Sequence, residues 1–305
     1  MKIVAVNGAT GFVGTHVVKS LVERGVRPRA IVRRGAVGRD IDGLRQLGAE
    51  IAEVNFEAVD GSVIEALRGA GSLVHLIGSI APKRGTHFDS LHQGIASRFI
   101  SAAKETGLAK IVMVTALGAA PDAPSEYHRS KWHAEEALRR SGLTYVILRP
   151  SLIVGRSVGH RDSKMVRRYL ELIKSKKKVP LVMGGANLVQ PIFIGDLVEA
   201  VARALEQETW DNTELELAGD QVLTTRDFVG ALMKTLHVQK DFVSIPRPLA
   251  WCVGLLAEQL QTVPILSRDQ VRIAGINGNT KHNALVEDFG ITPQRLEDVL
   301  GVYQQ

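Results

Sequence analysis

The sequence predicts an α/β fold with a doubly wound parallel sheet and a smaller C-terminal region over the carboxyl edge of that sheet. Three observations support this prediction: a glycine-rich turn directly after the first apolar run, a steady alternation of strand-like and helical segments, and the loss of that alternation after Pro150. Strands that alternate with helices pair in parallel through right-handed crossovers. With 305 residues, 45% of them hydrophobic, the chain can bury a large core.

The glycine-rich turn follows an apolar strand at residues 3–6 and precedes a helix with an apolar stripe at residues 15–22. In a dinucleotide-binding turn, Gly8 permits a tight bend, Gly11 lets the backbone approach the pyrophosphate, and Gly14 lets the helix pack closely on the sheet. The helix then directs its free N–H groups and positive dipole end at the anion. The alternative is an ordinary turn. We predict a dinucleotide site that includes Gly8, Thr10, Gly11, Phe12, Val13 and Gly14.

The alternation continues with further apolar runs, many of them rich in β-branched residues. They predict strands at residues 28–32, 49–56, 73–77, 110–115 and 143–148. Helices are expected at residues 62–68, 91–106 and 125–140, and glycines at Gly25, Gly107 and Gly142 mark helix ends.

After Pro150 the pattern changes. An amphipathic helix is expected at residues 162–174, and residues 191–194, with a helix at 196–205, are expected to return to the main sheet. Two or three further helices are expected from residue 215 onward. We therefore assign residues 1–155, with 189–207 returning, to a Rossmann-type dinucleotide-binding domain, and residues 156–188 and 208–305 to a substrate or lid region.

The end of the second predicted strand indicates which dinucleotide is bound. NAD-binding folds usually carry an Asp or Glu about twenty residues after the glycine motif, where it holds the ribose 2′-OH. This chain has Arg33 and Arg34 there. Two guanidinium groups suit the 2′-phosphate of NADP, which a carboxylate would repel. The arginines therefore favour NADP(H) over NAD(H), and the alternative is a pair of solvated surface arginines.

Tyr127 and Lys131 are candidates for proton transfer. Their i, i+4 spacing in the helix expected at residues 125–140 places both side chains on one helix face. A nearby ammonium favours tyrosinate, so we expect Lys131 to lower the pKa of Tyr127 and make it a usable acid or base. This spacing also arises by chance. The position of the pair after the fifth predicted strand is what favours a role in proton transfer.

Composition limits the compartment and the kind of site. The single cysteine, Cys252, suits a reducing compartment, and no residues stand at metal-ligand spacing, so no metal is expected. We find no secretory signal, and the apolar run at residues 249–257 is far shorter than the ~20 residues that span a bilayer. These features predict a cytoplasmic protein, at most peripheral on the inner face of the membrane.

Two segments bear on partners. The basic set at residues 156–178 is expected to be a solvated face, with docking to an acidic partner or to anionic lipid headgroups as the alternative. The run at residues 249–257 is expected to be the core of a lid helix, with an apolar contact on a membrane surface as its alternative. The net charge of +6 has no nucleic-acid motif beside it, so nucleic acid is not expected as a partner.

Four segments, GATGFVG, YHRSK, LRPSLIVG and VQPIFIGDLVEA, resemble an extended or atypical short-chain dehydrogenase/reductase. Further segments, VTALGAA, RSKWHAEEAL and FGITPQRLEDVLGVY, are more similar to the nucleotide-binding accessory subunit of respiratory complex I and its stand-alone bacterial relatives. This resemblance implies bound NADPH, held by the glycine turn, the arginine pair, a residue beside the adenine at Asn55 or Phe56, and the Tyr127–Lys131 pair beside the nicotinamide. It also implies cofactor contacts at Ile77, Gly78, Thr115 and Pro150.

One position departs from the pattern of an active dehydrogenase. Such enzymes carry a Ser or Thr hydroxyl a few residues into the loop after strand five, whereas this loop reads Ala116-Leu117-Gly118. Thr115 is the hydroxyl nearest to that position. It either takes the catalytic role beside Tyr127 and Lys131 or is a β-former in a buried strand.

Three functions follow from these observations. The first is an NADP(H)-dependent oxidoreductase that acts on a carbonyl, alcohol or quinone-like substrate. The second is a non-catalytic NADPH-binding accessory or assembly subunit of respiratory complex I or of a membrane complex for quinone biosynthesis. The third is a redox sensor that binds NADP without turnover, which the intact Tyr127–Lys131 pair disfavours.

Overall fold

The computed structural model describes residues 3–56, 61–80, 85, 87–262 and 264–304. Its centre is a seven-stranded parallel sheet with the strand order β11-β6-β5-β4-β1-β2-β3. The strands are β1 (Ile3–Asn7), β2 (Arg27–Arg33), β3 (Glu50–Val54), β4 (Ala70–His75), β5 (Lys110–Val114), β6 (Thr144–Pro150) and β11 (Thr213–Leu217). The predicted doubly wound α/β fold is confirmed, and the order reverses between β1 and β4, where such sheets bind ligands.

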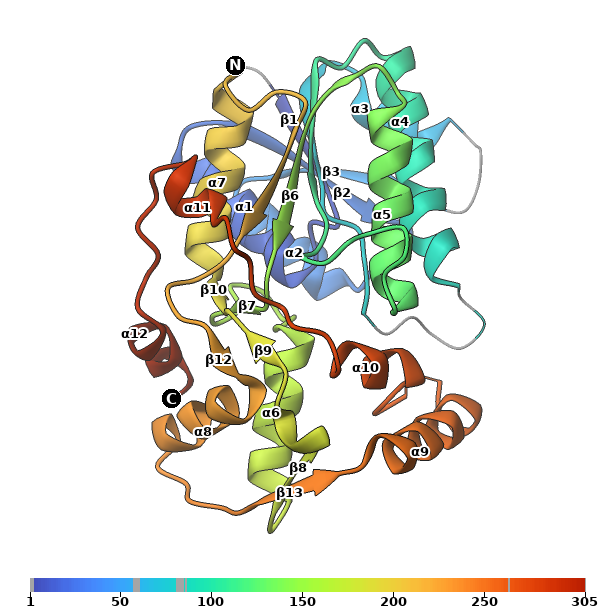
Figure 1. Cartoon of the computed structure of the whole chain (residues 1–305). Helices are drawn as coiled ribbons and strands as arrows, with labels where there is room; N and C mark the ends of the chain where they lie inside the picture. The colour runs from blue at the N-terminus through green and yellow to red at the C-terminus, as the bar shows by residue number, and fades with distance from the viewer. Residues whose placement is uncertain (1–2, 57–60, 81–84, 86, 263, 305) are drawn as a thin grey trace.

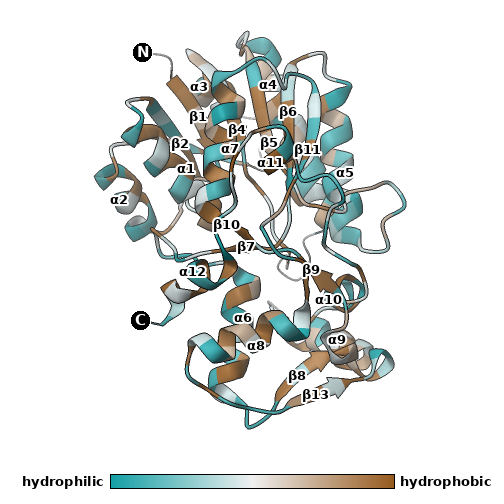
Figure 2. Cartoon of the chain, turned by 60° about the vertical axis from the view of Figure 1, so that its left-hand side comes forward, coloured by the Kyte–Doolittle hydropathy of each residue, from teal (hydrophilic) through white to brown (hydrophobic). Residues whose placement is uncertain are grey.

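Helices cover both faces of the sheet, as Figure 1 shows. On one face α1 (Phe12–Glu23), α2 (Gly38–Gln46), α7 (Ile194–Glu206) and the short α11 (Ala284–Glu287) share a core with the strands. On the other face lie α3 (Ser62–Leu67), α4 (Ile95–Glu105) and α5 (Glu126–Arg139), with a π-helical turn, Ser90–Gly94, before α4. Figure 2 shows that the inner strands are hydrophobic and the outer helix faces are hydrophilic. The layers therefore bury the apolar faces of the sheet under the helices.

The rest of the chain forms a second lobe, which we call the C-terminal lobe. It contains the helices α6 (Lys164–Ser175), α8 (Thr225–Thr235), α9 (Arg247–Leu260), α10 (Arg268–Ile273) and α12 (Leu296–Leu300). Its strands form three two-stranded sheets: β7 (Ile153–Val154) with β10 (Ile192–Phe193), β9 (Leu188–Val189) with β12 (Leu223–Thr224), and β8 (Val179–Val182) with β13 (Phe242–Ile245). Residues of α6, α8, α12 and β8 form a core separate from the two cores of the main sheet.

One strand prediction was wrong, and one strand of the main sheet was not predicted. The segment at residues 191–194 does not join the main sheet, because β10 pairs with β7 alone. The chain returns to the main sheet one element later, through α7 and β11, which pairs with β6. β11 lies within residues 208–305, which the sequence analysis assigned to the lid region. α2 was not predicted at all, since its sequence GRDIDGLRQ is short, charged and interrupted by glycine.

The helices beyond residue 215 also differ from the prediction. The described residues there form five α-helices rather than two or three. The expectation that residues 249–257 form a lid core was wrong as well. These residues are helical in α9, but only Ala250, Gly254 and Ala257 are buried there; Trp251 is half-buried against a small core with Leu266 and Val271, and the leucines and Val253 are exposed.

Candidate cofactor and active site

A cavity of about 1290 Å³ lies between the carboxyl ends of the main-sheet strands and the C-terminal lobe. Its walls include residues that follow β1, β4 and β5, residues of α5, and apolar residues of the C-terminal lobe. Most of the site residues predicted from the sequence line it: Gly8, Thr10, Gly11, Phe12, Val13, Gly14, Arg33, Phe56, Ile77, Gly78, Thr115, Tyr127, Lys131 and Pro150. Arg34 and Asn55 are not among the described residues that line it.

The turn between β1 and α1 has the geometry of a phosphate cradle. Gly8 has φ +67°, a left-handed conformation that favours glycine. A Cβ on Gly14 would lie 2.3 Å from the carbonyl oxygen of Gly8, so only glycine lets α1 approach the turn this closely. Among the described residues, no side chain caps the start of α1 and no acidic residue stands in its first turn. The positive end of this helix therefore faces the cavity uncompensated, as an anion site requires.

Arginine side chains lie at the β2 end of the cavity. Arg33 ends β2, and its guanidinium carbon lies 5.8 Å from the ring centroid of Phe56. Arg161, which the sequence analysis assigned to a solvated basic face, also lines the cavity. It donates a 2.9 Å hydrogen bond to Oδ2 of the buried Asp40 in α2. Arg33 and Arg161 are thus two arginines in the wall of the cavity.

Tyr127 lies in the first turn of α5 and is half-buried among aromatic rings. Its ring centroid is 5.6 Å from that of His92 and 5.1 Å from that of His128, both in edge-to-face geometry. Burial raises the pKa of Tyr127 to about 12. The prediction that Lys131 would lower this pKa was therefore wrong, because desolvation of the phenolate sets the direction of the shift.

Lys131 lies one helical turn beyond Tyr127 and is buried. Its Nζ donates a 3.4 Å hydrogen bond to the carbonyl oxygen of Ile77. Burial lowers the pKa of Lys131 to about 8, against the opposing effect of Glu135. A Cβ on Gly78 would come within 2.5 Å of this Nζ, so glycine at that position leaves room for the ammonium.

His92 supports the Tyr127 turn from the π-helical segment, and sequence analysis missed it. Its Nδ1 is 2.7 Å from Oγ of Ser130, which itself donates to the carbonyl oxygen of Tyr127. Its Nε2 accepts a 3.1 Å hydrogen bond from the backbone N–H of Ser79. Burial holds the pKa of His92 well below its usual value, so the ring is neutral and carries its proton on Nδ1.

Thr115 lines the cavity, but its hydroxyl has a partner in the protein interior. Oγ1 donates a 2.6 Å hydrogen bond to Oε1 of Glu135, a fully buried carboxylate on α5. Glu135 is also held by Arg149, whose Nε lies 3.0 Å from the same oxygen. The hydroxyl is therefore part of a charged network behind the cavity wall.

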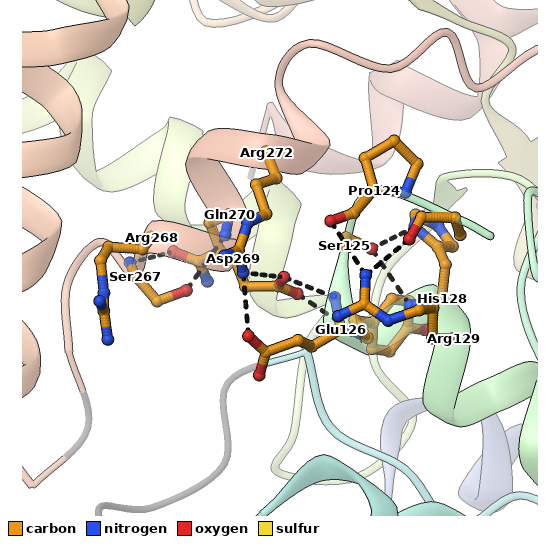
Figure 3. Close-up of polar contacts among 12 residues, drawn as sticks. Pro124, Ser125, Glu126, His128, Arg129, Ser267, Arg268, Asp269, Gln270 and Arg272 are labelled. Carbon is orange, nitrogen blue, oxygen red and sulfur yellow. Dashed lines mark hydrogen bonds and ion pairs between the residues drawn. The ribbon is translucent and has the colours of Figure 1, made fainter. Parts of the chain in front are cut away.

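The start of α5 is held by a residue of the C-terminal lobe, as Figure 3 shows. The buried carboxylate of Asp269 in α10 accepts hydrogen bonds from the backbone N–H groups of Glu126, at 2.7 Å, and of Tyr127, at 3.0 Å. Arg272 forms a 3.0 Å ion pair with Glu126. No sequence motif indicated this contact, because the partners are more than 140 residues apart.

Comparison with known proteins identifies the family. A family model described as NAD(P)H-binding matches residues 8–167, which include the cradle, Arg33, Tyr127 and Lys131. The chain belongs to this NAD(P)H-binding family. The similarity to complex I accessory subunits and to atypical short-chain dehydrogenases/reductases, inferred from the sequence motifs, is confirmed by the relatives described next.

Two relatives in sequence and one solved structure of similar fold are informative. The chain is 25% identical to the mitochondrial NADH dehydrogenase [ubiquinone] 1 alpha subcomplex subunit 9 of Arabidopsis thaliana, over 97% of this chain and 75% of that protein. It is 32% identical to a ceramide reductase of Caulobacter vibrioides, over 50% of this chain and 47% of that protein. Its fold matches an Escherichia coli NADPH-dependent quinone oxidoreductase complexed with NADPH, with a TM-score of 0.77, 19% identity, and coverage of 99% and 100% of the two chains.

Proposed function

We propose that this protein is an NADP(H)-dependent oxidoreductase that transfers a hydride between the nicotinamide and a carbonyl, alcohol or quinone-like substrate. The observation that carries the proposal is that the glycine cradle, Arg33 and the Tyr127–Lys131 pair line one cavity. Membership of an NAD(P)H-binding family supports the cofactor class.

The residues of the cavity fit an NADP cofactor. The N–H groups at the start of α1 would hold the pyrophosphate, and Arg33, with its neighbour Arg34, would attract the 2′-phosphate. Phe56, with Asn55 before it, would lie beside the adenine, and Ile77, Gly78 and Pro150 would line the rest of the groove. When bound, the nicotinamide gives or accepts the hydride.

The chain's own residues would move the proton. With its pKa raised to about 12 by burial, Tyr127 is protonated at neutral pH and can donate to a substrate oxygen during reduction. Lys131 is charged below pH 8 and can hold a ribose hydroxyl or stabilise the tyrosinate left behind. A catalytic role for Thr115 would require its hydroxyl to leave Glu135.

The substrate side of the cavity favours an apolar molecule. The C-terminal lobe contributes a largely aliphatic and aromatic wall to the cavity: Leu172, Leu181, Val182, Phe228, Leu266 and Ile273. Such a wall suits a quinone ring or a carbonyl carried on an apolar body. The ceramide reductase and quinone oxidoreductase among the similar proteins are consistent with this class.

The test is NADPH oxidation by the purified full chain with a soluble naphthoquinone as acceptor. Tyr127→Phe is expected to lower kcat by about 10²-fold or more, because it removes the proton donor. The Kd for NADPH should change little. Tyr169→Phe is the matched control, since Tyr169 lines the same cavity on the lobe side. If Tyr127→Phe turned over every tested acceptor at the wild-type rate, the proposal would be wrong.

A second candidate is an NADPH-binding accessory or assembly subunit of a membrane complex, respiratory or quinone-biosynthetic, on the cytoplasmic face of the membrane. Two observations favour it: the Thr115 hydroxyl is already bound by Glu135, and the similarity to the complex I subunit extends over 97% of the chain. Retrieval of the tagged chain with complex I subunits from detergent-solubilised membranes, together with unchanged function of Tyr127→Phe, would favour this role.

A further inference from the structure

The outer side of α9 presents an unusual row of large apolar side chains. Leu249, Val253, Leu256 and Leu260 are 54%, 41%, 57% and 81% exposed. Their i, i+4, i+7, i+11 spacing places them on one side of the helix. We call these four residues the α9 face. Ile265, 67% exposed, follows the end of the helix.

The rest of the structure fixes this face in its outward position. The small residues Ala250, Gly254 and Ala257 are the buried side of α9. A Cβ on Gly254 would lie 3.0 Å from the backbone nitrogen of Arg268, so α10 packs directly against this side. Glu258 is held in a 2.7 Å ion pair with Arg268. α9 therefore cannot rotate its leucines inward without breaking these contacts.

An exposed row of basic residues lies in the same part of the C-terminal lobe. Lys174, Lys176, Lys177 and Lys178 are all exposed at the end of α6 and the start of β8. β8 pairs in parallel with β13, so these lysines lie at the start of β13, where Lys178 forms a 3.6 Å ion pair with Asp241, and α9 begins beyond the other end of β13, after Pro246. Figure 1 shows β8, β13 and α9 together at the end of the molecule farthest from the main sheet. We call residues 174–178 the lysine row.

We infer that the α9 face and the lysine row form a docking surface for a bilayer that contains anionic lipids. The leucines would enter the boundary between headgroups and acyl chains, and the lysines would contact the lipid phosphates. Helices that lie in the membrane interface combine an apolar face with positive charge, and here the charge would come from the segment between α6 and β8 rather than from α9 itself. Among the described residues, no helix is long and apolar enough to cross a membrane, so contact would be with the surface.

Charge argues for lipid over a second copy of the chain. A two-fold interface between copies applies the same patch to itself. An interface that covered both the α9 face and the lysine row would bring the lysine rows of two copies together, and like charges in one interface cost free energy. An anionic bilayer instead complements the lysines and covers the leucines in a single contact. This inference does not depend on the proposed hydride chemistry.

The test is flotation of the full chain with vesicles of phosphatidylcholine alone or with a minority of phosphatidylglycerol. Wild type should float with the anionic vesicles. The double variant Leu256→Ser, Leu260→Ser should partition to the vesicles at least about 10-fold less. Each substitution removes most of an aliphatic side chain, whose burial in the membrane would favour binding. Both positions are exposed, so NADPH binding should be kept. Val286→Ser on α11, at 47% exposure, is the matched control and should bind like wild type.

The lysine row is tested separately with Lys176→Glu, Lys177→Glu. Loss of the preference for phosphatidylglycerol supports its role, and an unchanged preference overturns it. Vesicle binding by the leucine variant equal to that of wild type overturns the docking surface. So does a wild-type chain that is dimeric in solution and becomes monomeric in the leucine variant, because a second copy would then be the partner of the α9 face.

Discussion

Single residues control the protonation state of the candidate active site. Burial lowers the pKa of Lys131 to about 8 and raises that of Tyr127 to about 12. As pH rises through 8, Lys131 therefore loses its charge while Tyr127 stays protonated. We expect kcat for reduction to be steady below pH 8 and to fall above it, because the positive charge that would stabilise tyrosinate disappears. Steady-state rates on both sides of pH 8 measure this.

Lys131→Arg provides the control for that profile. A guanidinium keeps its charge throughout this range, so the fall above pH 8 should vanish even if the overall rate is lower. Lys131→Met should give a low rate that is flat across pH 8. If kcat fell equally steeply above pH 8 in both variants, a group other than Lys131 would be responsible for the pH dependence.

How far the sequence predicts the site depends on how local each interaction is. The glycine turn singled out in the sequence, with Gly8, Gly11 and Gly14, lines the cavity, and its geometry depends on neighbours within a few residues. The partner of Thr115 was not predictable, because Glu135 reaches it from another element. The predicted direction of the Tyr127 pKa shift was wrong because it depends on contacts with another element. The rings of Phe88 and His92, from the segment before α4, pack against the Tyr127 ring and bury it.

At the level of secondary-structure elements, α10 holds the start of α5. The Asp269 carboxylate accepts from two backbone N–H groups and so caps the helix that carries Tyr127. Asp269→Asn removes the negative charge and one of the two acceptor oxygens. We expect a loss of about 1 kcal/mol in the free energy of unfolding, the usual effect of losing a helix cap. We also expect kcat to fall several-fold with little change in the KM for NADPH, because Tyr127 is displaced while the cradle is intact.

Chemical denaturation and steady-state kinetics of the same preparation measure both effects. Asp298→Asn is the matched control, since Asp298 is an exposed acidic residue in the first turn of α12. It should leave kcat unchanged. A rise in the KM for NADPH without any loss of kcat in Asp269→Asn would show that α10 does not position Tyr127.

Elements were predicted well where periodicity was strong and poorly where tertiary pairing decides. The six strands with long apolar runs were predicted. In β11, whose sequence is TELEL, glutamates alternate with leucines over only five residues, and the segment forms a strand by pairing with β6. The α9 helix shows a second limit of prediction from periodicity. Periodicity indicates which side chains share a face, but not whether another element covers that face, so Leu249 and Leu256 were expected inside and are exposed.

At the level of the whole molecule, the cavity is shared by the two lobes. The main sheet supplies Gly8 and Arg33, and the C-terminal lobe supplies Arg161, Arg168 and an apolar wall. Arg161 crosses between the lobes to Asp40, and Arg168 donates a 2.9 Å hydrogen bond to Gln270 of α10. A ligand in the cavity would therefore contact both lobes and should stabilise the folded chain as a unit.

Cofactor preference can thus be measured through stability. NADPH at a hundred times its Kd should add about 2.7 kcal/mol to the free energy of unfolding. NADH at the same concentration should add clearly less, because it lacks the phosphate that Arg33 would contact. In Arg33→Ala the NADPH shift should drop to the NADH level, since a hydrogen bond to a charged group contributes about 1.5–3 kcal/mol. Arg39→Ala, whose side chain is 69% exposed, should keep the NADPH shift. Equal shifts by both cofactors in wild type would refute the preference for NADP and leave Arg33 as a surface residue beside Phe56.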